Sequence, residues 1–134
     1  MLPSSPKPAA ESLASSERQL DVPTIVKRCG NNAKFASQVL EKFQSLATGE
    51  LTKLEKALAA GDSATAARSA HSLKSMTAYV AADKASSLAH RIEELGRTSQ
   101  LAEMATMFCS LRQEIDWAIS WIGQSEQVRA LKSA

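Results

Sequence analysis

Apolar residues recur at spacings of three and four along most of this chain, and this periodicity constrains the fold more than any other feature. Such spacings place side chains on one face of an α-helix. With only 5 glycines, 4 prolines and 4% aromatic residues, the chain has the composition of a helical protein rather than a β-sandwich or barrel. The clearest run of apolar positions consists of Leu101, Met104, Phe108, Leu111, Ile115, Ala118 and Ile122.

The same pattern predicts one short helix and three more long ones. The short helix covers LDVPTIVKRC and ends at Gly30, since proline suits a first helical turn and glycine suits a helix end. Long helices are predicted from the asparagines at 31 and 32 to residue 60, unbroken at Gly49, then over residues 63–80, 83–95 and 101–122, the last capped by Thr98 or Ser99. The predicted apolar face of the first long helix consists of Phe35, Val39, Phe43, Leu46, Leu54 and Leu58. We therefore expect an all-α fold, an antiparallel up-and-down four-helix bundle with a short additional N-terminal helix.

Length and composition predict one domain with flanking segments. Residues 1–18 are rich in Ser, Pro and Ala and are expected to form a disordered tail or linker. Residues 19–124 form the predicted bundle, and residues 125–134 a C-terminal extension that is frayed or partly helical.

The charge distribution and the hydropathy of the chain predict its type of partner and its location. The 16 basic and 14 acidic residues are interspersed, so we expect no nucleic-acid partner. No apolar run approaches the roughly 18 residues of a membrane span, and we expect a monomer without membrane contact. Cys29 and Cys109 lie far apart without metal-type spacing, which favours reduced thiols and a cytoplasmic location.

His71 is the residue that points to chemistry. On a helical wheel it lies opposite Leu73 and Val80, so its imidazole is expected to face solvent and to offer a neutral nitrogen nucleophile. Small neighbours would leave room for a partner's catalytic pocket, and cationic neighbours would offset the charge of a phosphoryl group. Its neighbours on this face are Ala67, Arg68, Lys74, Ser75 and Ala78. The chain has no glycine-rich phosphate loop and no evident carboxylate cluster, so we expect no cofactor or metal ligands on it and Mg²⁺ on the partner.

The stretch SAHSLKS, residues 69–75, resembles the signature of the histidine phosphotransfer (HPt) family, in which the histidine precedes a variable residue, Leu, Lys and a small residue. Residues 82–97 are similar to the family's next helix, and residues 20–43 and 57–62 to the segments before the histidine helix. The resemblance implies a phosphorelay protein of a two-component system, a phosphocarrier rather than a self-sufficient enzyme. It would accept a phosphoryl group on His71 from a receiver-domain aspartate and pass it to another receiver. Its implied partners are response-regulator receiver domains and a hybrid histidine kinase.

The resemblance also implies roles for individual residues. His71 is the phosphoacceptor, through Nε2, and Lys74 is the cation beside the phosphoryl group. Glu93 matches a position whose side chain reaches toward the histidine from the next helix, and Arg97 lies one turn beyond it. An exposed ion pair between Glu93 and Arg97 explains these two charges about equally well. The residues predicted to contact a partner are Ala67, Arg68, Ser75, Ala78, Glu93 and Arg97.

Departures from the family pattern leave alternatives open. The family usually has glycine where this chain has Ser75, and commonly again at Ala78 and Ala81. One alternative is therefore an HPt-like interaction module that transfers no phosphoryl group and binds or inhibits a kinase or response regulator. In another, His71 and Lys74 carry out acid–base chemistry on a small substrate, which a concave pocket around His71 would favour. His90 is predicted to be a surface residue.

Overall fold

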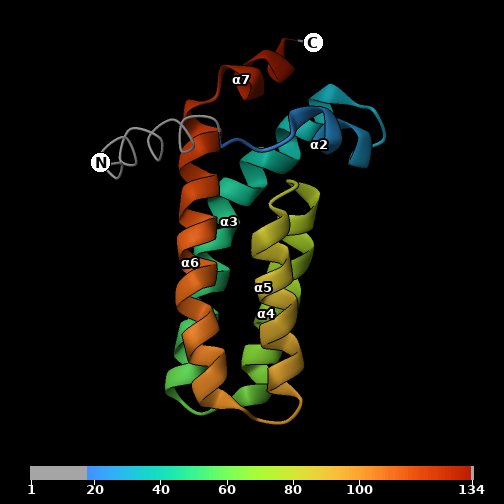
Figure 1. Ribbon diagram of the computed structural model, residues 1–134. Helices are drawn as coiled ribbons and strands as arrows, with labels where there is room; N and C mark the ends of the chain where they lie inside the picture. Colours follow the sequence, from blue (N-terminus) through green and yellow to red (C-terminus); the bar gives the residue numbers. More distant parts are fainter. Residues whose placement is uncertain (1–17, 134) are drawn as a thin grey trace, which may run out of the picture.

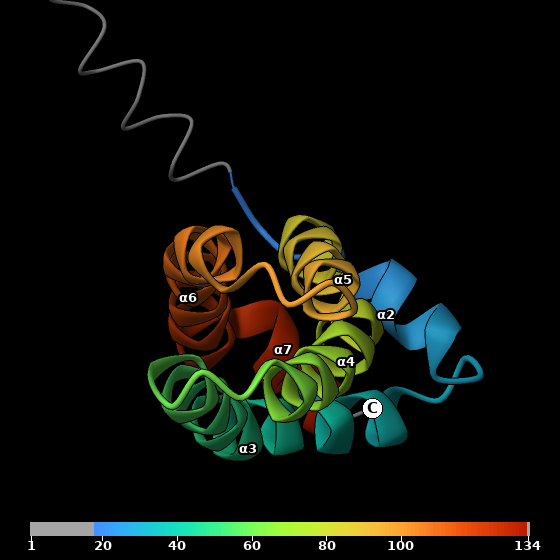
Figure 2. The same ribbon diagram turned by 90° about the horizontal axis from the view of Figure 1, so that it is seen from below.

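The computed structural model describes residues 18–133, which form six helices and no strand (Figure 1). The four long helices are α3 (Ala33–Ala59), α4 (Ser63–Tyr79), α5 (Asp83–Gly96) and α6 (Leu101–Gln124). Each packs on its neighbour in sequence, and α6 returns to pack on α3, which closes the ring of helices seen in Figure 2. The predicted four-helix bundle with an additional N-terminal helix, α2 (Val22–Arg28), is confirmed.

The buried face of α3 differs from the predicted one. Phe43 and Leu54 are buried as expected, but the side chains of Phe35 and Leu46 are 47% and 54% exposed. A neighbouring stripe faces the core instead, formed by Ala36, Leu40, Phe43, Ala47, Leu51, Leu54 and Ala57. Both stripes have helical spacing, and periodicity alone does not decide which one faces the other helices. The predicted stripe of α6 is correct, with Leu101 only partly buried and the other six positions buried.

Most helices begin and end close to the residues that the sequence predicts. The side chains of Asn32 and Asp62 accept hydrogen bonds from the first turns of α3 and α4 at 2.9 and 3.0 Å. The predicted cap of α6 is wrong, because Gln100 occupies the N-cap position and makes no side-chain capping bond. Ala81 adopts a φ of 57°, and the following amide donates to the Thr77 carbonyl at 2.9 Å. Ala81, in the link from α4 to α5, thus adopts a left-handed conformation, although its Cβ makes this conformation less favourable than for glycine.

The ends of the bundle extend beyond their predicted limits. Arg18, assigned to the tail, places its guanidinium carbon 3.8 Å from the centroid of the Trp117 ring and pairs with Glu114. The rest of the predicted tail, residues 1–17, lies outside the described residues. The C-terminal extension, predicted to be frayed or partly helical, forms the helix α7 (Glu126–Lys132), which packs on α3 and buries Val128 and Leu131. Among residues 18–133, no helix combines the length and apolar character needed to cross a bilayer.

Candidate functional site

His71 lies on the exposed ridge of α4. Its side chain is 59% exposed, whereas Leu73 and Val80, on the opposite side of the helix, are fully buried. Arg68, Ser72 and Ser75 are exposed on the same helix. The packing of α4 into the bundle therefore presents the imidazole to solvent, as its place on the helical wheel predicts.

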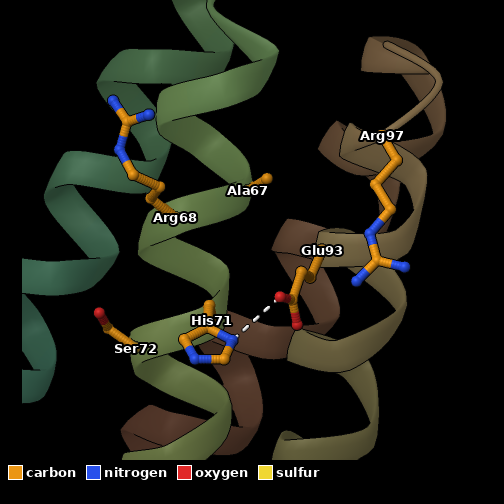
Figure 3. Close-up of a pocket in the computed structure, with 6 residues that line it drawn as sticks. All are labelled: Ala67, Arg68, His71, Ser72, Glu93 and Arg97. Atoms are coloured by element: carbon orange, nitrogen blue, oxygen red, sulfur yellow. Dashed lines mark hydrogen bonds and ion pairs between the residues drawn. The ribbon is translucent and has the colours of Figure 1, made fainter.

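Glu93 of α5 joins His71 to Lys74. One carboxylate oxygen, Oε2, lies 2.9 Å from His71 Nδ1 (Figure 3). The other, Oε1, accepts a hydrogen bond from Lys74 Nζ at 2.9 Å. The Glu93 side chain is only 14% exposed. The hydrogen bond from Lys74 lowers the pKa of Glu93, burial opposes this change, and the hydrogen bond from His71 supports it. Glu93 is therefore an ionised acceptor at neutral pH.

The charge of Glu93 determines the tautomer of His71. A carboxylate only accepts hydrogen bonds, so the Nδ1 that faces it must carry the hydrogen, and in the neutral imidazole Nε2 then holds the lone pair. The two nitrogens flank Cε1, and their outward directions diverge widely. Figure 3 shows Nδ1 turned toward α5 and the second ring nitrogen turned away from it, toward the side of α4 that carries Ser72. The exposed nitrogen is thus the nucleophilic one.

A groove of about 390 Å³ runs beside the ring, between α4 and α5. It brings together four of the predicted partner-binding residues with His71, and it adds Ser72, which sequence reasoning missed. Lys74, Ser75 and Ala78 do not line it. The lining residues are Ala67, Arg68, His71, Ser72, Glu93 and Arg97. Because the His71 side chain is more than half exposed, the groove does not enclose it as a small-substrate pocket would.

The ion pair considered between Glu93 and Arg97 is not formed. Glu93 binds Lys74 and His71 instead, and Arg97 has no carboxylate within 4.0 Å among residues 18–133. His90 is half exposed, as predicted; its Nε2 lies 3.4 Å from Glu94, and its Nδ1 lies 3.9 Å from Glu93 Oε1. No group of three or more potential metal-binding side chains gathers within the described part of the chain.

An apolar hollow of about 210 Å³ lies between α3 and α4. It contains Leu46 and Tyr79, two of the three exposed large hydrophobic residues in the described chain. Sequence reasoning missed this surface because it assigned Val39 and Leu46 to the core. The sequence does indicate an exposed apolar surface on α3, because this helix carries two adjacent apolar stripes and only one of them can face the core. The hollow is lined by Val39, Lys42, Phe43, Leu46, Met76 and Tyr79.

Comparison with known proteins gives one finding. A model of the Hpt domain family matches residues 38–121, which is more than half of the chain and includes the whole groove beside His71. Neither the curated proteins nor the solved structures include a match to this sequence.

Proposed function

This chain belongs to the Hpt domain family, whose members are phosphocarriers of two-component signalling, and on this premise we propose that it is a phosphorelay intermediate. His71 accepts a phosphoryl group from an aspartate of one response-regulator receiver domain and passes it to an aspartate of another. A hybrid histidine kinase is the proposed source of the phosphoryl group. The observation that carries the proposal is the exposed imidazole of His71, which Glu93 holds through Nδ1.

The proposed transfer follows from this arrangement. The lone pair on Nε2 attacks the phosphorus of the aspartyl phosphate, and an N–P bond forms as the P–O bond breaks. The bonding pair leaves with the carboxylate of the receiver aspartate, while the hydrogen stays on Nδ1, where it is donated to the ionised Glu93. The second transfer reverses these steps on another receiver. Phosphoryl transfer mainly requires positioning and charge stabilisation, and in the proposed reaction the receiver supplies the Mg²⁺.

Docking of the receiver is proposed on the ridge of α4 that carries His71. The small side chains of Ala67, Ser75 and Ala78 leave space above the ring, and Arg97 on α5 offers a guanidinium to the acidic pocket of a receiver. The receiver would also cover the apolar hollow at Leu46 and Tyr79, because exposed apolar surface of this kind favours contact with a partner over contact with water. The carrier is expected to act as a monomer.

The first experiment tests His71 directly. The full chain is mixed with a phosphorylated receiver and Mg²⁺, and the products are expected to include an acid-labile, base-stable phosphoprotein. His71→Gln is expected to abolish this product, because the glutamine has no nucleophilic nitrogen. His90→Gln is the matched control and should keep a yield close to wild type, since His90 lies outside the groove and its Nδ1 is 3.9 Å from Glu93 Oε1, beyond hydrogen-bonding distance.

Labelling that persists in His71→Gln would reject the site. Tight receiver binding without any transfer, for the wild-type chain and a panel of receivers, would favour the interaction module over the carrier.

A further inference from the structure

The cation that the family resemblance assigns to the phosphoryl group lies on the other side of the ring. Lys74 donates to Glu93 at 2.9 Å, on the α5 side, where Nδ1 also points. Nε2, which would carry the phosphoryl group, faces away from α5 (Figure 3). Lys74 is therefore paired with a carboxylate that lies on the Nδ1 side of the ring, whereas the proposed attachment point is Nε2.

Arg97 is also on the α5 side. Figure 3 shows its side chain extending from α5 toward Glu93 rather than across the ring. It lines the groove with His71, but the imidazole stands between it and the side to which Nε2 points.

Arg68 is the cation on the Nε2 side. It precedes His71 by three residues on α4, lines the same groove, and lies with Ser72 on the side of α4 away from Glu93 (Figure 3). Its guanidinium is exposed and donates to the Thr65 hydroxyl at 3.0 Å. Among residues 18–133 it has no carboxylate within 4.0 Å. The nearest anionic influence is Asp62, which accepts a hydrogen bond from the Thr65 hydroxyl at 2.6 Å and whose pKa is lowered in part by the charge of Arg68.

We propose that Arg68, rather than Lys74, is the group of this chain that contacts the phosphoryl group on His71 Nε2. Residues three apart on a helix have Cβ atoms about 5–6 Å apart, a distance that an arginine side chain spans. A rotation of the Arg68 side chain exchanges the Thr65 hydroxyl for two phosphoryl oxygens, which match the forked donors of a guanidinium. Lys74 then acts as a positioning residue through Glu93. The inference rests on the proposed function.

The test removes the protein partner, so that docking does not contribute. The full chain is phosphorylated with phosphoramidate, a small-molecule donor, and the phosphoryl group on His71 is titrated by ³¹P NMR. In Arg68→Gln we expect the pKa of the phosphoryl group to rise, with roughly a tenfold increase in proton affinity, because a charge-assisted contact to the dianion is lost. Arg68→Lys is expected to restore part of the effect.

Two variants serve as controls. Arg91→Gln removes the same charge from an arginine that pairs with Glu94 at 3.8 Å and does not line the groove, and it should titrate like wild type. Lys74→Gln should slow transfer from a receiver through the loss of its bond to Glu93, without moving the phosphoryl titration.

Three results would overturn the inference. Arg68→Gln could titrate like Arg91→Gln, or Lys74→Gln could move the titration more than Arg68→Gln does. Arg68→Gln could also slow transfer from a receiver with an unchanged titration, which would assign Arg68 to the partner surface. If wild-type His71 takes no phosphoryl group from either phosphoramidate or a receiver, the proposed function fails as well, and the two failures are thereby distinguished.

Discussion

At the scale of single residues, the geometry around His71 depends on Glu93. Its two carboxylate oxygens hold His71 and Lys74 at the same distance, 2.9 Å, and so connect the ridge of α4 to α5. The contact requires the charged form of Glu93, because an ionised carboxylate is the acceptor for both hydrogens. Part of the stability of the fold should therefore depend on pH.

Glu93→Gln tests this dependence. The pKa of Glu93 is lowered in the folded chain, so its charge stabilises the fold above the pKa it has when unfolded, and this contribution is lost as the pH falls through the lower folded pKa. We expect the variant to be less stable than wild type by about 1 kcal/mol at pH 7, the size of a partly exposed charge-assisted hydrogen bond. The difference should shrink below about pH 4, where glutamate ordinarily protonates.

Urea unfolding at pH 7 and pH 3 measures the two differences. Glu94→Gln is the control, because Glu94 pairs only with exposed groups of its own helix, His90 and Arg91. A stability gap that stayed constant down to pH 3 would show that the charge of Glu93 is not involved.

At the scale of helices, Gly96 determines how closely α5 approaches α4. A Cβ built at Gly96 would lie 2.8 Å from the Ala67 Cβ and 3.3 Å from the Ser63 carbonyl oxygen. These contacts are too short to be relieved without moving one helix. Gly49, in the middle of α3, is the opposite case, because an added Cβ meets no atom within 4 Å.

The two glycines predict opposite effects of the same substitution. Gly96→Ala should destabilise the fold by about 1–3 kcal/mol and weaken the bond between His71 and Glu93, since it separates α4 from α5. Gly49→Ala should stabilise it by about 0.5–1 kcal/mol through its better helix propensity. Chemical unfolding gives both values, and His71 ring ¹⁵N shifts report the bond. Stabilisation by both substitutions would contradict the close approach at Gly96.

In the molecule as a whole, the helix α7 contributes to the stability of the fold but lies away from the groove at His71. The helix α7 packs on α3 through Val128 and Leu131, and Lys132 pairs with Glu41 at 2.8 Å. In Figure 1 this helix lies with α2 at one end of the molecule. None of its residues lines the groove at His71.

Val128→Ala should therefore separate the two properties. Loss of two buried methyl groups is expected to lower the stability by roughly 1–2 kcal/mol, while phosphorylation of His71 by phosphoramidate keeps its wild-type rate below the melting temperature. The exposed neighbour Ala130 gives the control, Ala130→Ser, with little effect on either property. A fall in the phosphorylation rate that follows the loss of stability would show that α7 is coupled to the site.

The helices, most of their ends and the solvent-facing position of His71 could be predicted from the amino-acid sequence. These features are local, because helix periodicity, caps such as Asn32 and Asp62, and a place on a helical wheel depend on residues a few positions apart. The resemblance to a family, carried by residues 69–75 and their flanks, added the chemical role of His71.

Three features became evident only from the packing of the helices: which stripe of α3 faces the core, that α7 packs on α3, and that Glu93 binds Lys74 as well as His71. Each of these depends on how one helix is rotated against another and how near it comes, as Gly96 and Ala67 illustrate. Rotation and distance between helices follow from the packing of many side chains at once, which no local pattern contains. Sequence patterns therefore could not predict the direction of Nε2, on which the role of Arg68 depends.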